Sequence, residues 1–201
     1  AILYDQHQES NPFRLNMKEG DRDEIVNFVY HGDVEIGMIN IWTTYRKVTN
    51  AQMRAKNIQY YRLASNAPAI VLGPGNPLYT MPDGYKVALD LLRDFPCVMY
   101  EEQNCGTYSN VSELLGLGRT SGEIVVDSRA MLYELMENTP AFTITSTNRR
   151  AYQKASYYPR ARSFEIADET GISCDVGWIK RRDYTPSPLV LEFLQLVSSY
   201  Y

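Results

Sequence analysis

The chain has 201 residues, of which 44% are hydrophobic and 22% charged, and its formal net charge is −4. This length and composition allow a buried core in one domain or in two small lobes. The negative charge argues against a nucleic-acid-binding surface on this chain, and no apolar run has the length of a membrane span. The three cysteines have no metal-binding spacing and cannot form a complete disulfide framework, so no metal is expected and a reducing compartment fits best.

Residues 23–41, DEIVNFVYHGDVEIGMINI, predict a helix that ends at Gly32 and a buried strand over residues 34–39. Apolar side chains within residues 25–29 share one helical face. Such a helix–strand unit is half of a βαβ crossover and therefore predicts a parallel α/β sheet. A polar loop over residues 40–44 follows, at the strand end where open α/β sheets bind ligands.

The rest of the chain predicts further alternation of helices and strands. The run Gly73-Pro74-Gly75-Asn76-Pro77 marks a boundary between lobes. Before it, the patterns predict a polar loop with a short helix over 46–56 and strands over 59–63 and 69–72. After it, they predict helices over 87–92, 108–115, 129–137, 148–153 and 186–197, and strands over 96–100, 124–126, 141–145, 162–166 and 175–180.

The order of these motifs resembles the effector-binding domain of LysR-type transcriptional regulators. The matching pieces cover nearly the whole chain and are EIVNFVYHGDVEIGMI, VLGPGNPLY, DFPCVMYEEQ, SELLGLG, IVVDSRAMLYELMENTPAFTIT and VGWIKRRDYTPSPLVLEFLQLV. The resemblance implies an α/β fold like that of type 2 periplasmic binding proteins, in which two crossover strands join two lobes around a ligand cleft. Lobe I is expected to comprise residues 1–71 plus 177–201, and lobe II residues 72–176.

The same resemblance implies partners and a cellular setting. The family's N-terminal winged helix-turn-helix does not match any part of this chain, so DNA binding is expected only through a missing N-terminal domain of a parent protein. A cytoplasmic homodimer is expected, or a tetramer in the full-length protein. The apolar helix over 25–29 and the strand over 124–126 are candidate dimer surfaces, although ordinary core packing explains both equally well.

Three polar segments follow predicted strands and are expected to converge in the cleft. Their hydroxyl, amide and backbone N–H groups suit a small polar metabolite. The candidate effector-binding residues are Asn40, Trp42, Thr43, Thr44, Tyr100, Glu101, Glu102, Gln103, Cys105, Thr107, Thr143, Thr145 and Ser146. The simpler interpretation is that Thr143 and Thr145 alternate along a strand and that Trp42 serves packing. The two glutamates would repel an anionic effector, so a cationic or neutral one stays open.

Other functions are less well supported by the residues. Glu101 and Glu102 suggest an acid/base pair, but adjacent carboxylates on a strand point to opposite faces. No catalytic triad, phosphate-binding loop or metal motif accompanies them, so neither an enzyme nor a cofactor is expected. The segment VMYEEQNC resembles the stretch before the reactive cysteine of the family's peroxide sensors, but no second cysteine follows up to Gly122, and Cys105 is interpreted as lining the cleft. The alternative function is a solute-binding protein of a transporter, secreted or lipid-anchored.

Overall fold

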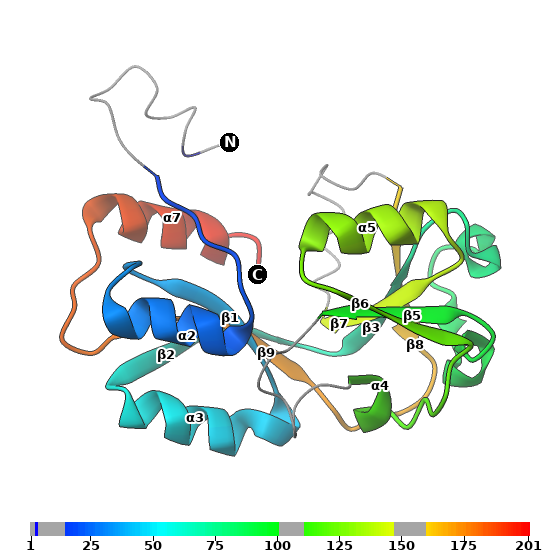
Figure 1. Ribbon diagram of the computed structural model, residues 1–201, viewed down its shortest axis with the longest axis horizontal. Coiled ribbons are helices and arrows are strands. Elements are labelled where there is room, and N and C mark those ends of the chain that lie inside the picture. Colours follow the sequence, from blue (N-terminus) through cyan, green and yellow to red (C-terminus); the bar gives the residue numbers. More distant parts are fainter. Residues whose placement is uncertain (1–2, 4–14, 101–110, 147–159) are drawn as a thin grey trace.

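The computed structural model of the chain describes residue 3 and residues 15–100, 111–146 and 160–201. Within these ranges the strands form two sheets that lie next to each other along the long axis of the molecule (Figure 1). The smaller sheet has the strand order β1-β9-β2, and the larger sheet has the order β4-β8-β3-β7-β5-β6. Each sheet carries helices and a core of its own, so the chain folds as two α/β lobes.

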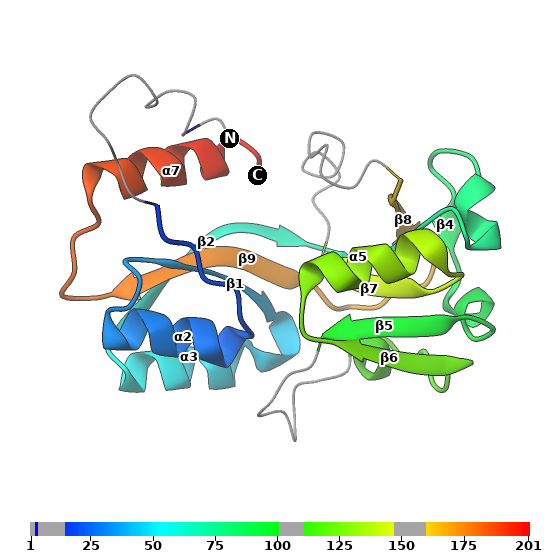
Figure 2. The same ribbon diagram turned by 45° about the horizontal axis from the view of Figure 1, so that its top comes forward.

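The smaller sheet is covered on both faces. Helices α2 and α3 lie on one face and α7 on the other (Figure 2). The core under α2 and α3 consists of apolar side chains from both helices and all three strands. The elements of this lobe are α2 (Arg22–His31), β1 (Gly37–Trp42), the 3-10 helix η1 (Thr43–Tyr45), α3 (Arg46–Ala55), β2 (Ile58–Asn66), β9 (Cys174–Arg181) and α7 (Pro188–Ser198).

The larger sheet has a central strand, β3, that is buried along its whole length. Ile70 and Leu72 pack into the cluster on one face, and Val71 packs into the cluster that includes α5 on the other. A strand buried on both faces explains the continuous apolar run in the sequence. The elements of this lobe are β3 (Pro68–Leu72), η2 (Pro77–Thr80), β4 (Lys86–Val87), η3 (Leu89–Leu92), β5 (Pro96–Tyr100), α4 (Val111–Leu114), β6 (Gly122–Val126), α5 (Arg129–Asn138), β7 (Phe142–Ser146) and β8 (Arg162–Ile166).

Helix α2 forms where the sequence predicts it because both of its ends are capped. The Glu24 backbone N–H donates to the Asp21 carboxylate at 2.7 Å, and the Asp21 N–H donates back to the Glu24 carboxylate at 2.9 Å. This reciprocal capping satisfies two of the N–H groups that a helix start leaves free. At the other end Gly32 adopts a left-handed conformation with φ of 80°, which ends the helix.

The strand after α2 differs from the prediction in position and pairing. It runs over Gly37–Trp42, so Asn40 and Trp42 belong to β1 and not to a loop. The expectation of a parallel sheet is wrong here, because β1 and β2 both pair antiparallel with β9, which lies between them. Parallel pairing occurs in the larger sheet, between β5 and β6, β5 and β7, and β4 and β8.

Two further expectations are corrected by the structure. Residues 46–55 form the regular helix α3, anchored by the buried side chains of Thr49 and Met53 at i and i+4. Residues 86–92 form a two-residue strand and a 3-10 helix in place of the predicted helix. Strand β6 is an edge strand and not fully buried, since Val125 is 54% exposed. The helix predicted over 148–153 lies outside the described residues.

Two connections cross between the sheets. Strand β2 of the smaller sheet is followed, after Ala67, by β3 of the larger sheet, and residues 167–173 lead back from β8 to β9. The region around these two crossings is called the junction below. The lobe limits expected at 71/72 and 176/177 fall inside β3 and β9, and those numbers stay a prediction.

Candidate functional site

A buried carboxylate lies at the junction. Asp175 is the second residue of β9 and is only 2% exposed. Arg46 Nη2, from the start of α3, lies 2.7 Å from its Oδ2, and Arg62 Nη1, from β2, lies 3.8 Å from its Oδ1. A buried charge requires such partners, because its desolvation is costly. Two guanidinium groups face one carboxylate, so this group of three side chains carries a net positive charge.

Thr43 is tied to the crossing that leads into β9. Its backbone N–H donates to the Ser173 carbonyl oxygen at 2.8 Å, and the Ser173 N–H donates to the Thr43 hydroxyl oxygen at 3.2 Å. The Ser65 hydroxyl donates to the Ser173 hydroxyl at 3.2 Å. These bonds fix the end of β1 against the crossing, and the Thr43 hydroxyl keeps its own hydrogen for a further acceptor.

Several polar atoms at the junction are buried without a hydrogen-bond partner among the described residues. They are Arg46 Nε, the Tyr60 hydroxyl, Asn66 Nδ2, the Ser146 hydroxyl and Asp175 Oδ1. Burial, and then the charge of Asp175, raise the pKa of Tyr60, so its phenol stays protonated and can donate. A buried donor without an acceptor costs about 1–3 kcal/mol. A ligand with acceptor atoms would satisfy the donors of Arg46, Tyr60 and Asn66, whereas Asp175 Oδ1 requires a donor.

A buried thiol completes the junction. Cys174 opposes Trp42 on one side and Asn66 on the other. Burial raises its pKa to about 11, while the neighbouring Ser146 hydroxyl acts in the opposite direction. The thiol therefore stays protonated near neutral pH and is a poor nucleophile. Among the described residues, no group of three or more His, Cys, Asp or Glu side chains could hold a metal ion.

Some of the predicted site residues meet at the junction. Trp42 and Thr43 reach it from the end of β1, and Ser146 reaches it from the end of β7, where it opposes Pro68 at the start of β3. Cys174 opposes Trp42 in the pairing of β1 with β9, and its thiol neighbours the Ser146 hydroxyl. The structure thus places residues from two of the three predicted segments at the contact between the lobes.

Other predicted residues are placed differently or are not described. Asn40 is exposed in the middle of β1, and Thr44 is exposed on η1. Thr143 and Thr145 alternate along β7, and Thr143 is 7% exposed, as the simpler interpretation expects of a strand residue. Tyr100 ends β5. Glu101, Glu102, Gln103, Cys105 and Thr107 lie outside the described residues.

Sequence reasoning missed the charged part of the junction. The sequence patterns place Arg46 in a polar loop with a short helix, Arg62 and Asp175 in predicted strands, and Asn66 between two predicted strands. One signal was available: Asp175 interrupts the otherwise apolar run CDVGWI, and a carboxylate inside a buried strand needs a basic partner elsewhere in the chain.

The sequence matches no family model and no curated protein. The fold, however, is similar to solved structures of LysR-type regulators. The effector-binding domain of a BenM variant has a TM-score of 0.63 at 14% identity, covering 100% of this chain and 85% of that one. The effector-binding domain of QuiR, solved in complex with shikimate, has a TM-score of 0.58 at 10% identity, covering 99% of this chain and 86% of that one.

A longer regulator shows the same similarity. HinK, a LysR family transcriptional regulator from Pseudomonas aeruginosa, has a TM-score of 0.61 at 16% identity, with 98% of this chain covered. This chain spans only 63% of the length of HinK. The chain therefore has the fold of LysR effector-binding domains, and the resemblance seen in the sequence is confirmed at the level of the fold. Among the described residues, no helix is long and apolar enough to cross a bilayer.

Proposed function

We propose that the chain is the effector-sensing domain of a LysR-type bacterial transcription regulator, and that a small polar metabolite binds at the junction and modulates DNA-dependent transcription. The main support is the group of buried donors at Arg46, Tyr60 and Asn66, which have no acceptor among the described residues. These groups lie where two sheets meet, in a fold that QuiR uses to bind shikimate. Binding between two lobes couples ligand contacts to the arrangement of the lobes.

The proposed effector carries a carboxylate. Arg46 and Arg62 exceed the charge of Asp175, and a guanidinium group can bind a carboxylate with two parallel hydrogen bonds. The Thr43 hydroxyl retains a hydrogen for the same ligand. The anionic effector is thus favoured over the cationic or neutral one that the glutamates suggested.

In the proposed mechanism, one ligand contacts Thr43 in the first lobe and Ser146 in the second. It therefore favours the arrangement of lobes in which both contacts form, and a homodimer, or a tetramer of the full-length protein, passes this shift on. Val26 and Val29 of α2 are buried in the core, so the exposed Val125 on β6 is the better of the two candidate dimer surfaces. DNA contacts belong to an N-terminal domain of the parent protein in the cytoplasm, and we propose no enzymatic activity.

A thermal-shift screen of small carboxylates, each paired with its amide, tests this function. A true effector raises the unfolding midpoint because it binds only the folded chain, and the matched amide does so less. Arg46→Met and Thr43→Val should remove the shift, whereas Lys47→Met, an exposed position on α3, should keep it. An unchanged shift of the unfolding midpoint in both junction variants would refute the proposed site. The coding sequence upstream separates the two functions, since a regulator carries a winged helix-turn-helix and a solute-binding protein a signal peptide.

A further inference from the structure

A cavity lies between α2 and α3, away from the junction residues. Its volume is about 180 Å³, and both helices contribute to its walls. An apolar cavity of about 150 Å³ is large enough for benzene, so this space fits a ligand of similar size or slightly larger. The lining residues are Asp23, Val26, Asn27, Thr49, Gln52, Met53 and Lys56, none of which belongs to the proposed effector site.

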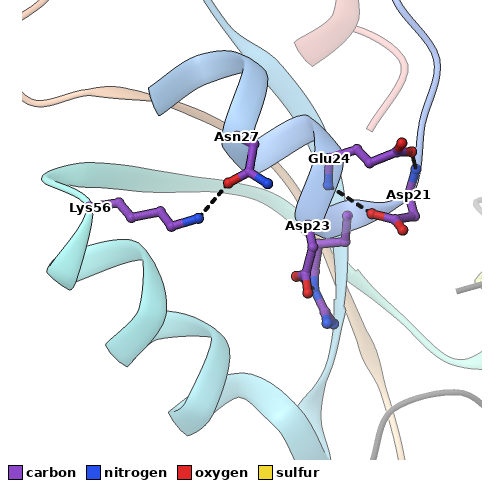
Figure 3. A network of polar contacts seen from close by, with 6 residues as sticks. Asp21, Asp23, Glu24, Asn27 and Lys56 are labelled. Carbon is purple, nitrogen blue, oxygen red and sulfur yellow. Dashed lines mark hydrogen bonds and ion pairs between the residues drawn. The ribbon is translucent and has the colours of Figure 1, made fainter. Parts of the chain in front are cut away.

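Asp23 and Lys56 carry opposite charges and both line this cavity, and each contacts a different neighbour. The Asp23 carboxylate lies 3.5 Å from Arg22 Nε, and the Lys56 ammonium donates to the Asn27 side-chain oxygen at 2.5 Å (Figure 3). Lys56 forms no ion pair with Asp23 within the described residues. An ammonium group has three hydrogens, and Asn27 accepts one of them, so Lys56 can still bind an anion.

The other lining residues are apolar or carry a hydroxyl, and they determine which uncharged groups a ligand needs. Val26 and Met53 are 5% and 2% exposed, and they form an apolar part of the wall. Thr49 is 1% exposed, and its hydroxyl has no hydrogen-bond partner among the described residues. A buried hydroxyl without a partner is costly, and a ligand that reaches it recovers that cost. The cavity lining thus combines the ammonium group of Lys56, the carboxylate of Asp23, the buried hydroxyl of Thr49 and an apolar part.

We propose that the cavity between α2 and α3 binds a free amino acid with an aliphatic side chain. Its carboxylate accepts hydrogen bonds from Lys56 and Thr49, its ammonium group pairs with Asp23, and its side chain packs on Val26 and Met53. Each of these groups is complementary to one part of the ligand, and only a zwitterion uses both charges. This site is separate from the effector site and does not depend on it.

A ligand series on the unmodified chain tests the proposal first. L-leucine, L-leucinamide and 4-methylpentanoate share one side chain, but the amide lacks the carboxylate and the acid lacks the ammonium group. Calorimetric titration should give L-leucine a dissociation constant at least about tenfold lower than that of either analogue, since each loses a charge-assisted contact. Equal affinities for the three compounds, or no binding of L-leucine at millimolar concentration, would overturn the proposal.

Variants then place the binding in the cavity. Lys56→Met and Asp23→Asn should each weaken L-leucine binding about tenfold or more. Thr49→Val keeps the shape of the side chain and should weaken binding without lowering the unfolding midpoint of the free chain, because the hydroxyl it removes has no partner. Lys47→Met, on the same helix but outside the cavity, is the matched control.

The outcome also separates this site from the effector site. Thr43→Val and Arg46→Met should leave L-leucine binding unchanged. If those two variants abolish it while Lys56→Met and Asp23→Asn do not, L-leucine binds at the junction and the cavity proposal is wrong. Failure to find any junction effector has no bearing on the result.

Discussion

Replacing Asp175 by asparagine tests whether the junction is held by charge. The substitution keeps the shape of the side chain and removes the negative charge that faces Arg46 and Arg62. The 2.7 Å contact with Arg46 is a charge-assisted hydrogen bond, worth about 1.5–3 kcal/mol. The Arg62 contact is 3.8 Å long and its side chain is 59% exposed, so it contributes only about 0–1 kcal/mol. Asparagine retains one acceptor and relieves the desolvation of a buried charge, which leaves an expected loss of about 1–2 kcal/mol.

Urea unfolding in a double-mutant cycle measures where this free energy resides. Combining Asp175→Asn with Arg46→Met should give a coupling of about 1–2 kcal/mol. Combining Asp175→Asn with Arg62→Met should give less than about 0.5 kcal/mol, because that pair is long and solvated. Equal couplings, a larger coupling to Arg62, or an unchanged stability of Asp175→Asn would refute the assignment of Arg46 as the main partner.

Three other predictions concern the rest of the fold. Gly37→Ala should lower the free energy of unfolding by about 1–3 kcal/mol, because the new Cβ would lie 2.5 Å from a methyl group of Ile25 on α2. Gly122→Ala is the control and should be nearly neutral in the same urea titration, because its new Cβ would lie 3.7 Å from the Pro96 side chain. Asp21→Ala should cost about 1 kcal/mol by removing the N-cap of α2, and an unchanged urea midpoint would contradict the capping argument. Burial raises the pKa of Cys97 to about 12 and that of Cys174 to about 11. Both thiols stay protonated in the folded chain, whereas in the unfolded chain they ionise above the ordinary thiol pKa. The free energy of unfolding is therefore unaffected below that pKa and falls above it by about 1.4 kcal/mol per pH unit for each thiol. Cys174→Ala should reduce the loss of stability between pH 9.5 and 10.5 by about that amount.

The parts of the fold that the sequence predicts well depend on near neighbours in the chain. Helix α2 carries its apolar stripe, its capping residues and its terminal glycine within a dozen residues. The sequence predicts only a short helix within a polar loop where the regular helix α3 forms, because α3 is mostly polar and only Thr49 and Met53 are buried. The position of β1 was misplaced by about three residues because its register is set by pairing with β9, far along the chain.

The candidate site was predicted only in part for the same reason. Thr43 and Ser146 follow predicted strands, and the structure brings both to the junction. The charged group of Arg46, Arg62 and Asp175 joins residues more than a hundred positions apart, and no local pattern announces such a pairing. Only the isolated carboxylate in an apolar strand pointed toward it.

Backbone-amide NMR during titration with a carboxylate found in the screen tests the central claim most directly. If the effector binds where the two sheets meet, the largest shifts should occur together at Thr43, Ser146 and Cys174, on both sides of the crossings. Shifts confined to one lobe, or to the outer helices α2 and α3 alone, would contradict binding at the junction.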